Sequence, residues 1–412
     1  METEAALTQS PRLREAGREP LSLALIDARN HTLRLFAAYE EALAAKSFEV
    51  PRVAELNPPL WELGHIGWFQ EYWLARNPER ARGERCDPRA ARLASIEPNA
   101  DRWYDSSNVP HDTRWSLDLP GLEATKLYLL ETLNGTLEAL DATEDGDSPL
   151  YFFRLALFHE DMHGEAFSYM AETLEFGAKS VNSILPALAP RAARDAIGFA
   201  ATRWPFGMQQ GGFVFDNEKW SHEVAIPEFE IDAQAVSWAQ FAEFVEDGGY
   251  DEERWWSPEG WQWQQRAGRR TPRHVEQLRH GVLARRFGQL LRVPLQLPAM
   301  HVNWYEADAW CRWAGRRLPT EVEWEAAACT GGSRGFHWGD VWEWTASAFR
   351  PFPGFVADPY RDYSAPWFGT HKSVRGASFA TRARMRHPKY RNFYLPERDD
   401  LFVGFRSCAI QP

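Results

Sequence analysis

Three histidines in two apolar segments have the types and spacing that suit metal chemistry. His159 and His163 lie in the sequence HEDMHGE, directly after the apolar run at residues 151–158. In a helix these two imidazoles are one turn apart, about 6 Å along the axis, on the same face. His65 lies in a second helix-like segment, GHIGWFQE, at residues 64–71. Three imidazoles on two neighbouring helices would form a facial metal site with open positions.

The alternative is that these are ordinary core histidines. The chain has 12 histidines, so a pair four residues apart can arise by chance. Unpaired imidazoles are costly to bury on an apolar helix face, however, and a third histidine on another helix favours the metal interpretation. Without a thiolate the set suits Fe(II), Zn, Ni or Cu, and the residues alone do not choose among them. Glu160 and Glu165 would orient the imidazole rings, or else lie on a solvated helix surface.

The elements that must position these histidines are predicted to be helices within residues 21–180. Apolar residues recur there at near-helical spacing, and proline or glycine marks the predicted helix starts. The helices are expected over residues 21–45, 58–77, 120–140 and 148–176. A long irregular connection at 79–119 would join the second helix to the third. Four helices with one long crossover predict a four-helix bundle, a fold that builds metal sites from facing helices.

The rest of the chain has a different character. Residues 1–20 are polar and rich in Arg and Glu, which predicts a mobile N-terminal arm. Prolines within 181–204 predict a linker. From 205 to 412, short β-like runs alternate with glycine, tryptophan and turn residues, with helical segments expected only at 238–246 and 304–314. We therefore predict an α+β domain with much irregular structure.

Composition and charge exclude several functional classes. A chain of 412 residues with 44% hydrophobic and 25% charged residues is typical of a globular protein of two domains. The net charge of −12 argues against binding nucleic acid or anionic membranes. No signal peptide or membrane-spanning run is evident, and the 4 scattered cysteines suggest free thiols. We expect a cytoplasmic protein, a monomer or weak oligomer, that acts on small molecules.

Fragments of the second half resemble the formylglycine-generating-enzyme (sulfatase-modifying-factor) fold, which is C-type-lectin-like. They are VNWYEA at 302–307, WAGRRLPTEVEWE at 313–325, VWEWT at 341–345, VRGASF at 374–379 and GFR at 404–406. The first half resembles the DinB-like four-helix bundle with three histidine ligands. This fusion is similar to the iron-dependent sulfoxide synthases of ergothioneine and ovothiol biosynthesis. The resemblance implies that His65, His159 and His163 bind Fe(II).

The reaction implied by this resemblance joins hercynine, the betaine of histidine, to a thiol donor with consumption of O2. Holding both substrates and oxygen at one metal turns an improbable encounter into an intramolecular step. The family also uses a tyrosine of the second domain as proton or hydrogen donor. Tyr360 is our candidate, with Tyr363 as substrate contact or substitute. The alternative is that both are packing residues in a loop.

The substrate contacts implied by the resemblance lie in YRNFY at residues 390–394, where aromatic ring faces would hold the trimethylammonium group. Several positions depart from the pattern of synthases that use γ-glutamylcysteine. Tyr394 replaces an Asp, an Arg pair is reduced to Arg398 followed by an Asp, and Met162 replaces a Gln. The predicted substrate-binding residues are Met162, Asn392, Phe393, Tyr394, Arg398 and Asp399.

These departures suit a neutral, hydroxyl-rich donor better than a zwitterionic dipeptide, because Tyr394, Asp399 and Asp400 can share hydrogen bonds with sugar hydroxyls. They resemble the selenoneine synthase branch, which implies a selenosugar donor and a selenoxide-type product. The alternative within the family is an ergothioneine-type synthase that uses cysteine or γ-glutamylcysteine.

Other classes of protein remain as alternatives. A copper-dependent formylglycine-generating oxidase would need a cysteine pair in the second half, where Cys311, Cys329 and Cys408 are scattered. A DinB-type thiol S-transferase would use the three histidines with Zn or Ni and would not need the second domain. A lectin-like binding protein would leave the histidines unexplained.

Overall fold

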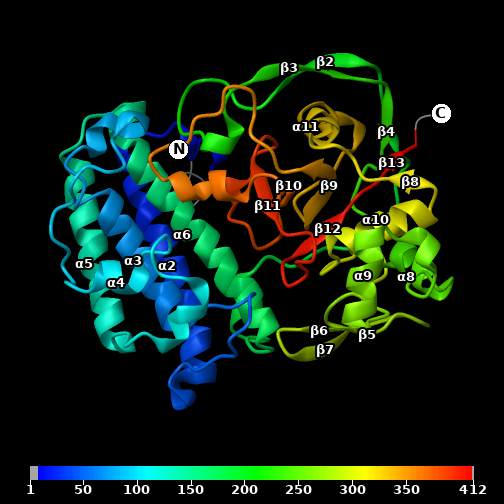
Figure 1. Ribbon diagram of the computed structural model, residues 1–412, viewed down its shortest axis with the longest axis horizontal. Coiled ribbons are helices and arrows are strands. Elements are labelled where there is room, and N and C mark those ends of the chain that lie inside the picture. The colour runs from blue at the N-terminus through cyan, green and yellow to red at the C-terminus, as the bar shows by residue number, and fades with distance from the viewer. Residues whose placement is uncertain (1–7, 411–412) are drawn as a thin grey trace.

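The computed structural model describes residues 8–410. Helices of the first half form one side of the molecule, and the strands and shorter helices of the second half form the other (Figure 1). Helix α6 (Asp147–Thr173) runs along the boundary between them. The predicted fold class, a four-helix bundle followed by an α+β domain, is confirmed.

The first half is a four-helix bundle. Its members are α2 (Arg18–Leu43), α3 (Pro59–Trp73), α5 (Leu122–Asp141) and α6. Helix α2 packs against α6, and α3 packs against α5. Buried residues recur along α2 at helical spacing, which explains both why the segment is helical and which face it turns inward. Pro59 begins α3, where its missing N–H would have no helical partner.

The connection between α3 and α5 is ordered and packs on α3. It contains three short helical segments, η3 (Arg80–Arg85), α4 (Ala100–Tyr104) and η4 (His111–Ser116). Asp101 accepts hydrogen bonds from the Trp68 indole N–H and from Arg76, each at 2.7 Å. The connection therefore holds the face of α3 that carries His65.

The described part of the N-terminal segment is packed into the body, so the predicted mobile arm is wrong for residues 8–20. Segment η1 (Pro11–Arg14) buries Leu13, and α2 already begins at Arg18. The buried Arg14 guanidinium donates to Glu218 at 2.7 Å. Polar composition misled the prediction because the partner of Arg14 lies about two hundred residues away in the sequence. Residues 1–7 of the predicted arm lie outside the described residues.

Two four-stranded sheets hold the second half together. The first has the order β1 (Ile197–Phe199), β4 (Phe229–Ile231), β13 (Cys408–Ala409), β8 (Arg316–Arg317). The second has the order β11 (Arg391–Tyr394), β10 (Lys372–Gly376), β9 (Trp342–Ala348), β12 (Val403–Phe405). Within this second sheet β12 pairs with β9 in parallel, and the other neighbours are antiparallel.

Two smaller sheets complete the second half. One is the hairpin of β2 (Thr202–Phe206) and β3 (His222–Ile226). The other is the antiparallel sheet β5 (Val275–Gln277), β6 (Val282–Arg286), β7 (Gln289–Val293). Because β1 pairs with β4, the second half already begins within the linker predicted for 181–204, which also contains α7 (Val181–Ile184).

Capping residues explain where the helices of the second half begin. These helices are α8 (Trp238–Glu246), α9 (Pro258–Ala267), α10 (Trp304–Trp313) and α11 (Glu321–Thr330). Reciprocal capping boxes, such as Thr320 with Glu323 at α11, satisfy backbone groups at the starts of α8, α10 and α11. The predicted helical segments correspond to α8 and α10, whereas α9 and α11 were missed.

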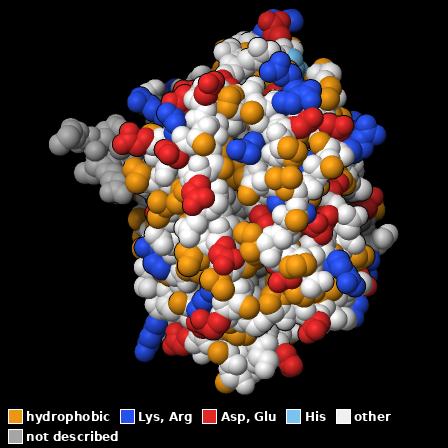
Figure 2. Space-filling model, turned by 90° about the vertical axis from the view of Figure 1, so that its left-hand side faces the viewer, with side chains coloured by type: hydrophobic (Ala, Val, Ile, Leu, Met, Phe, Trp, Pro, Cys, Tyr) orange, Lys and Arg blue, Asp and Glu red, His pale blue; other side chains and the backbone are white. Residues whose placement is uncertain are grey.

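The outer face of the bundle carries both signs of charge. Figure 2 shows acidic and basic side chains interspersed with small apolar patches on this side. Leu127 and Leu130 of α5 are among the exposed apolar residues. Within residues 8–410, no helix has both the length and the apolar content needed to cross a bilayer.

Candidate metal centre

The structure brings the three predicted histidines together. Helix α3 supplies His65, and α6 supplies His159 and His163 one turn apart. The ring centroid of His65 lies 5.1 Å from that of His159 and 4.9 Å from that of His163. One ring nitrogen from each histidine lies within 4.8 Å of the other two. Two helices that are separate in the sequence therefore present three imidazoles to a single point.

Hydrogen bonds fix which nitrogen of His65 and of His163 faces that point. The Nδ1 of His65 lies 2.7 Å from the Tyr104 carbonyl oxygen, which can only accept, so Nδ1 carries the hydrogen. The Nδ1 of His163 lies 2.5 Å from Glu62 Oε1. Both Nε2 atoms therefore keep their lone pairs, and Nε2 of His163 lies 3.1 Å from Nε2 of His159. Converging imidazole lone pairs are the donor set of a divalent transition metal, so the residues fit such an ion.

Aromatic rings shield His65 and His159 from water, and burial keeps these two imidazoles neutral. Trp61 stacks on His65 with ring centroids 4.9 Å apart, and Phe69 stacks on His159 at 3.5 Å. Burial, with the neighbouring His163, lowers the pKa of His65 to about 3 and that of His159 well below its usual value. Neutral imidazole is the form that binds a metal.

The carboxylate that orients a histidine is Glu62, which the sequence interpretation missed. Burial opposes its ionisation, but His163, together with His65 and Arg114, lowers the pKa of Glu62. The only sequence signal was its position three residues before His65 on the same helix. The expected roles of Glu160 and Glu165 were wrong: Glu160 pairs with Arg29 at 2.9 Å, and Glu165 accepts from the Trp342 indole N–H at 2.7 Å.

The predicted tyrosines lie at different distances from the histidines. The ring of Tyr360 meets Phe69 edge-on at 4.9 Å and lies 6.3 Å from the ring of His159. Burial raises the pKa of Tyr360, so its phenol stays protonated. Tyr363 stacks on Phe215 at 4.7 Å, and its hydroxyl lies 3.3 Å from that of Tyr390. Tyr360 is thus the tyrosine beside the metal centre.

An ion pair anchors the loop that carries both tyrosines. Asp358 accepts a hydrogen bond from Tyr151 of α6 at 2.7 Å, and Lys219 donates to both of its oxygens at 2.8 Å. The loop between β9 and β10 therefore reaches across the boundary to the bundle, which brings Tyr360 to Phe69.

A cavity of about 210 Å³ opens beside His163 and contains three of the predicted substrate residues: Met162, Asn392 and Tyr394. Asn392 donates to the Tyr394 hydroxyl at 3.1 Å. The cavity lies between the two halves. Its other lining residues are Asn57, Glu62, Glu165, Ala166, Tyr169, Trp342, Met385 and Tyr390. Of these, Asn57, Tyr169 and Met385 carry no spacing or motif that would have identified them, and Trp342 lies in the fragment VWEWT without having been predicted as a substrate residue.

The other three predicted substrate residues lie outside the lining of this cavity. Phe393 alternates to the opposite face of β11 and stacks on Phe349 at 4.1 Å. Arg398 donates to Asp400 at 2.6 Å. Asp399 is paired with Arg269 and, at 3.1 Å, with Arg273. The two aspartates expected to accept from sugar hydroxyls are therefore already engaged in ion pairs.

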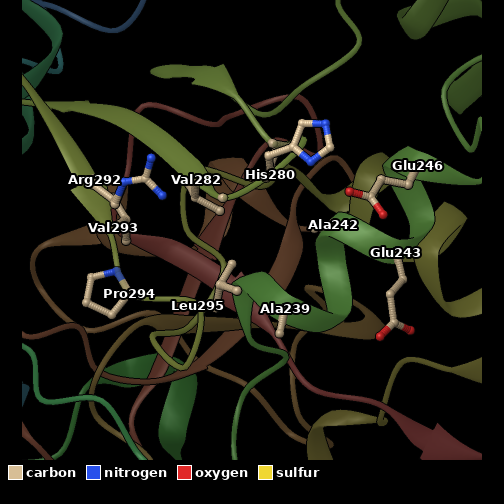
Figure 3. A pocket seen from close by; sticks show the side chains of 12 residues that line it. Ala239, Ala242, Glu243, Glu246, His280, Val282, Arg292, Val293, Pro294 and Leu295 are labelled. Atoms are coloured by element: carbon tan, nitrogen blue, oxygen red, sulfur yellow. The ribbon is translucent and has the colours of Figure 1, made fainter.

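A larger cavity of about 750 Å³ lies elsewhere, between α8 and strand β7 (Figure 3). Ala239 and Ala242 line the α8 side, and Arg292 and Pro294 line the strand side. Its lining consists of residues other than those predicted for the site. Size alone therefore does not identify the functional cavity.

Both halves of the chain match known families. The DinB superfamily matches residues 24–167, and the sulfatase-modifying factor enzyme 1-like domain matches residues 204–340. Among solved structures, the match to PvdO from Pseudomonas aeruginosa covers 54% of this chain and 99% of the PvdO chain, with 15% identity and a TM-score of 0.36. That similarity is too distant to bear on function.

Two curated relatives match along nearly their whole lengths, and each is named hercynine oxygenase. The protein of Mycolicibacterium smegmatis is 31% identical over 442 residues, which cover 94% of this chain and 98% of the relative. The protein of Mycobacterium tuberculosis is 33% identical over 436 residues, with the same coverage of both chains. With both halves matched in the same order, this chain is an enzyme of the hercynine oxygenase family.

Proposed function

We propose that this chain uses Fe(II), held by His65, His159 and His163, and O2 to join hercynine to a selenosugar. The imidazole C–H, the donor Se–H and O2 give a C–Se bond with a selenoxide oxygen, and the second oxygen atom leaves as water. The observation that carries the proposal is the convergence of three imidazoles beside a cavity lined by both domains. The names of the relatives support hercynine as the acceptor.

Each part of the metal centre has a task in this reaction. Fe(II) in a three-imidazole site supplies redox chemistry and open coordination positions. Glu62 and the Tyr104 carbonyl hold the rings of His163 and His65 in the orientation that keeps each Nε2 free. Phe69 covers His159 and excludes water from that side. The protonated phenol of Tyr360, whose ring lies 6.3 Å from that of His159, would supply the proton that the reaction needs.

The cavity wall suits the quaternary ammonium group of hercynine. Such a cation binds to aromatic faces and nearby dipoles. Trp342 and Tyr390 present rings whose centroids are 5.7 Å apart, and Asn392 lies in the same wall. Burial raises the pKa of Tyr394 and keeps its hydroxyl protonated. These groups offer ring faces and dipoles to the trimethylammonium group.

The same wall favours a neutral donor over a zwitterionic dipeptide. Its lining contains amides, phenols, thioethers and two carboxylates, and it includes neither Lys nor Arg. The guanidinium of Arg398 lies 5.7 Å from the centre of the Tyr394 ring and is paired with Asp400. A donor carboxylate would therefore find no free cation in this lining, whereas sugar hydroxyls would find Asn392 and Tyr394.

The test is oxygen consumption by the chain after anaerobic reconstitution with Fe(II). Hercynine is supplied with a selenosugar, the matching thiosugar, cysteine or γ-glutamylcysteine, and products are identified by mass spectrometry. We expect the highest kcat/KM with the selenosugar. A preference for γ-glutamylcysteine would overturn the donor assignment and leave the synthase in place. No oxygen uptake with any donor would overturn the synthase itself.

Elemental analysis tests the ligands separately from activity. His159→Ala and His163→Ala should each bind one equivalent of iron fewer than the unchanged chain. His280→Ala removes an exposed histidine outside the centre and should keep its iron. An iron content equal to that of the unchanged chain in either ligand variant would contradict the assignment.

A further inference from the structure

A second cluster of metal-ligating side chains lies at the far end of α6. Glu172 is on its last turn, about 13 Å along the axis from His163. His274 precedes strand β5, and His301 precedes helix α10. One ligand atom from each of the three residues lies within 4.8 Å of the other two. The cluster therefore combines one residue of the bundle with two residues of the second domain.

The ligand atoms of this cluster are buried without partners. Oε1 of Glu172, Nε2 of His274 and Nε2 of His301 have no hydrogen-bond partner among residues 8–410. Glu172 is 1% exposed and His301 is 3% exposed. Leaving a buried polar atom unpaired is costly, and here three such atoms converge. Their shared need for a partner points to a ligand between them.

The remaining atoms of the same side chains are already engaged, which fixes their orientation. Nδ1 of His301 lies 3.1 Å from the Asp399 carbonyl oxygen, so Nδ1 carries the hydrogen and Nε2 carries a lone pair. Oε2 of Glu172 accepts from the Phe287 backbone N–H at 2.8 Å. The rings of His274 and His301 meet edge-on with centroids 4.8 Å apart. Outer hydrogen bonds of this kind typically accompany metal ligands.

Arg286 is a competing cation beside Glu172. Its Nε lies 4.0 Å from Oε1 of Glu172, beyond hydrogen-bond distance, and its Nη1 contacts the Met300 sulfur at 3.6 Å. Its charge opposes a bound cation, so binding must depend on direct bonds to the imidazoles. That requirement disfavours Ca²⁺ and Mg²⁺, which prefer oxygen ligands, and favours an ion of the zinc class.

We propose that Glu172, His274 and His301 form a second metal site, for a divalent transition ion such as Zn²⁺, that ties the end of α6 to the second domain. Two imidazoles and one carboxylate are an established ligand set for zinc. The role is structural, because the site joins three separate elements across the boundary between the domains. The rival arrangement is a proton held between the Glu172 carboxyl and one imidazole, which needs no metal.

Zinc stoichiometry of the full-length chain tests this proposal. After equilibrium dialysis against Zn²⁺, we expect two equivalents, one at the three-histidine centre and one here. Glu172→Gln keeps the size of the side chain and an acceptor for Phe287, and His301→Gln removes one imidazole. Each should bind one equivalent fewer. A second equivalent that survives both substitutions would overturn the proposal.

His280→Gln is the matched control. His280 is exposed, belongs to the same part of the second domain, and shares the left-handed backbone of His274 and His301, with φ values of 61°, 67° and 60°. It should keep both equivalents. In His159→Ala, the equivalent at the first centre should be lost and the second should remain. Metal content rather than oxygen uptake is measured, so failure here is distinguishable from failure of the proposed reaction.

A measurement on the unchanged chain removes any dependence on how the variants fold. Co(II) titration of the metal-free protein, followed by visible absorption, should show two distinct binding phases. The thermal unfolding midpoint should rise further as the second phase fills. Saturation at one equivalent would overturn the proposal whatever the variants do.

Discussion

At the scale of single residues, carboxylates that look alike in the sequence have different functions. Glu62 orients His163, Glu160 neutralises Arg29, and Glu165 is a hydrogen-bond acceptor for Trp342 and Thr381 of the second domain. All three lie on helices near the metal centre. What separates them is the group that each one faces, and only the packing of the helices sets that.

Tyr360→Phe tests the phenol beside His159. The substitution removes the proton but keeps the ring that packs on Phe69. We expect unchanged binding of hercynine and a fall of about 100-fold or more in the coupled product, with oxidation of the donor alone increased. Product analysis under single turnover measures this ratio. Tyr363→Phe is the control, and an unchanged ratio in Tyr360→Phe would move the role to another group.

A pH effect on stability is expected from Asp216, whose pKa burial raises to about 7 while Ser364 donates to it at 2.5 Å. The folded chain binds the proton on the Asp216 carboxyl more tightly than the unfolded chain does. Its contribution to stability is therefore fully present below pH 4 and is lost as the pH rises through 7.

Asp216→Asn should remove that dependence. Between pH 5 and pH 7 the unchanged chain should lose on the order of 2 kcal/mol of unfolding free energy through Asp216, and the variant should not show this loss. Urea denaturation at the two pH values measures the difference, and other titrating groups cancel in the comparison. Parallel pH profiles for the two proteins would contradict the assignment to Asp216.

At the scale of elements, two helices carry the site. Helix α6 serves both domains: His159 and His163 face α3, whereas Asp161 and Glu165 bond to the second domain. This division follows from the helical repeat, which turns residues two positions apart to different sides. Helix α3 is buried over most of its length, because the bundle lies on one side and the packed connection on the other.

Gly64→Ala tests the close approach of that connection to α3. A Cβ at residue 64 would lie 2.2 Å from the Tyr104 ring, whose residue also supplies the carbonyl that holds His65. We expect a loss of about 1–3 kcal/mol in unfolding free energy and weaker metal binding.

Gly135→Ala is the matched control, because residue 135 lies within α5 and a Cβ there would meet no atom within 4 Å. It should stabilise the protein by about 0.5–1 kcal/mol, since alanine is the better helix former. Urea denaturation compares the two variants. Equal stabilities would show that the contact with Tyr104 does not constrain α3.

At the scale of the whole molecule, buried ion pairs join the halves. Arg384 donates to Asp161 of α6 at 2.6 Å and to Asp27 of α2 at 2.7 Å, and Arg14 pairs with Glu218. Such pairs contribute little net stability when complete, but they are costly when one partner is lost. They therefore fix the angle between the domains, which places Tyr360 beside the centre.

Arg384→Gln leaves Asp161 buried without its partner. We expect a loss of about 3–5 kcal/mol in unfolding free energy and a fall in activity, because the second domain would shift against α6. Arg312→Gln breaks an exposed pair with Asp308 and should cost about 0.5 kcal/mol or less. Denaturation followed by tryptophan fluorescence compares them, and similar losses would contradict the role given to the interface.

The sequence by itself determined the helices of the bundle and the three histidines of the candidate centre. Helical periodicity located the bundle, and a spacing of four residues placed His159 and His163 on one face, because both patterns depend only on the local repeat of the helix. The tertiary structure decided which side chains share a cavity. It turned Asp399 toward Arg269 and Arg273, brought Tyr169 and Trp342 to the cavity of His163, and packed the N-terminal segment. These contacts join residues far apart in the sequence, and no local pattern records which partner each side chain will meet.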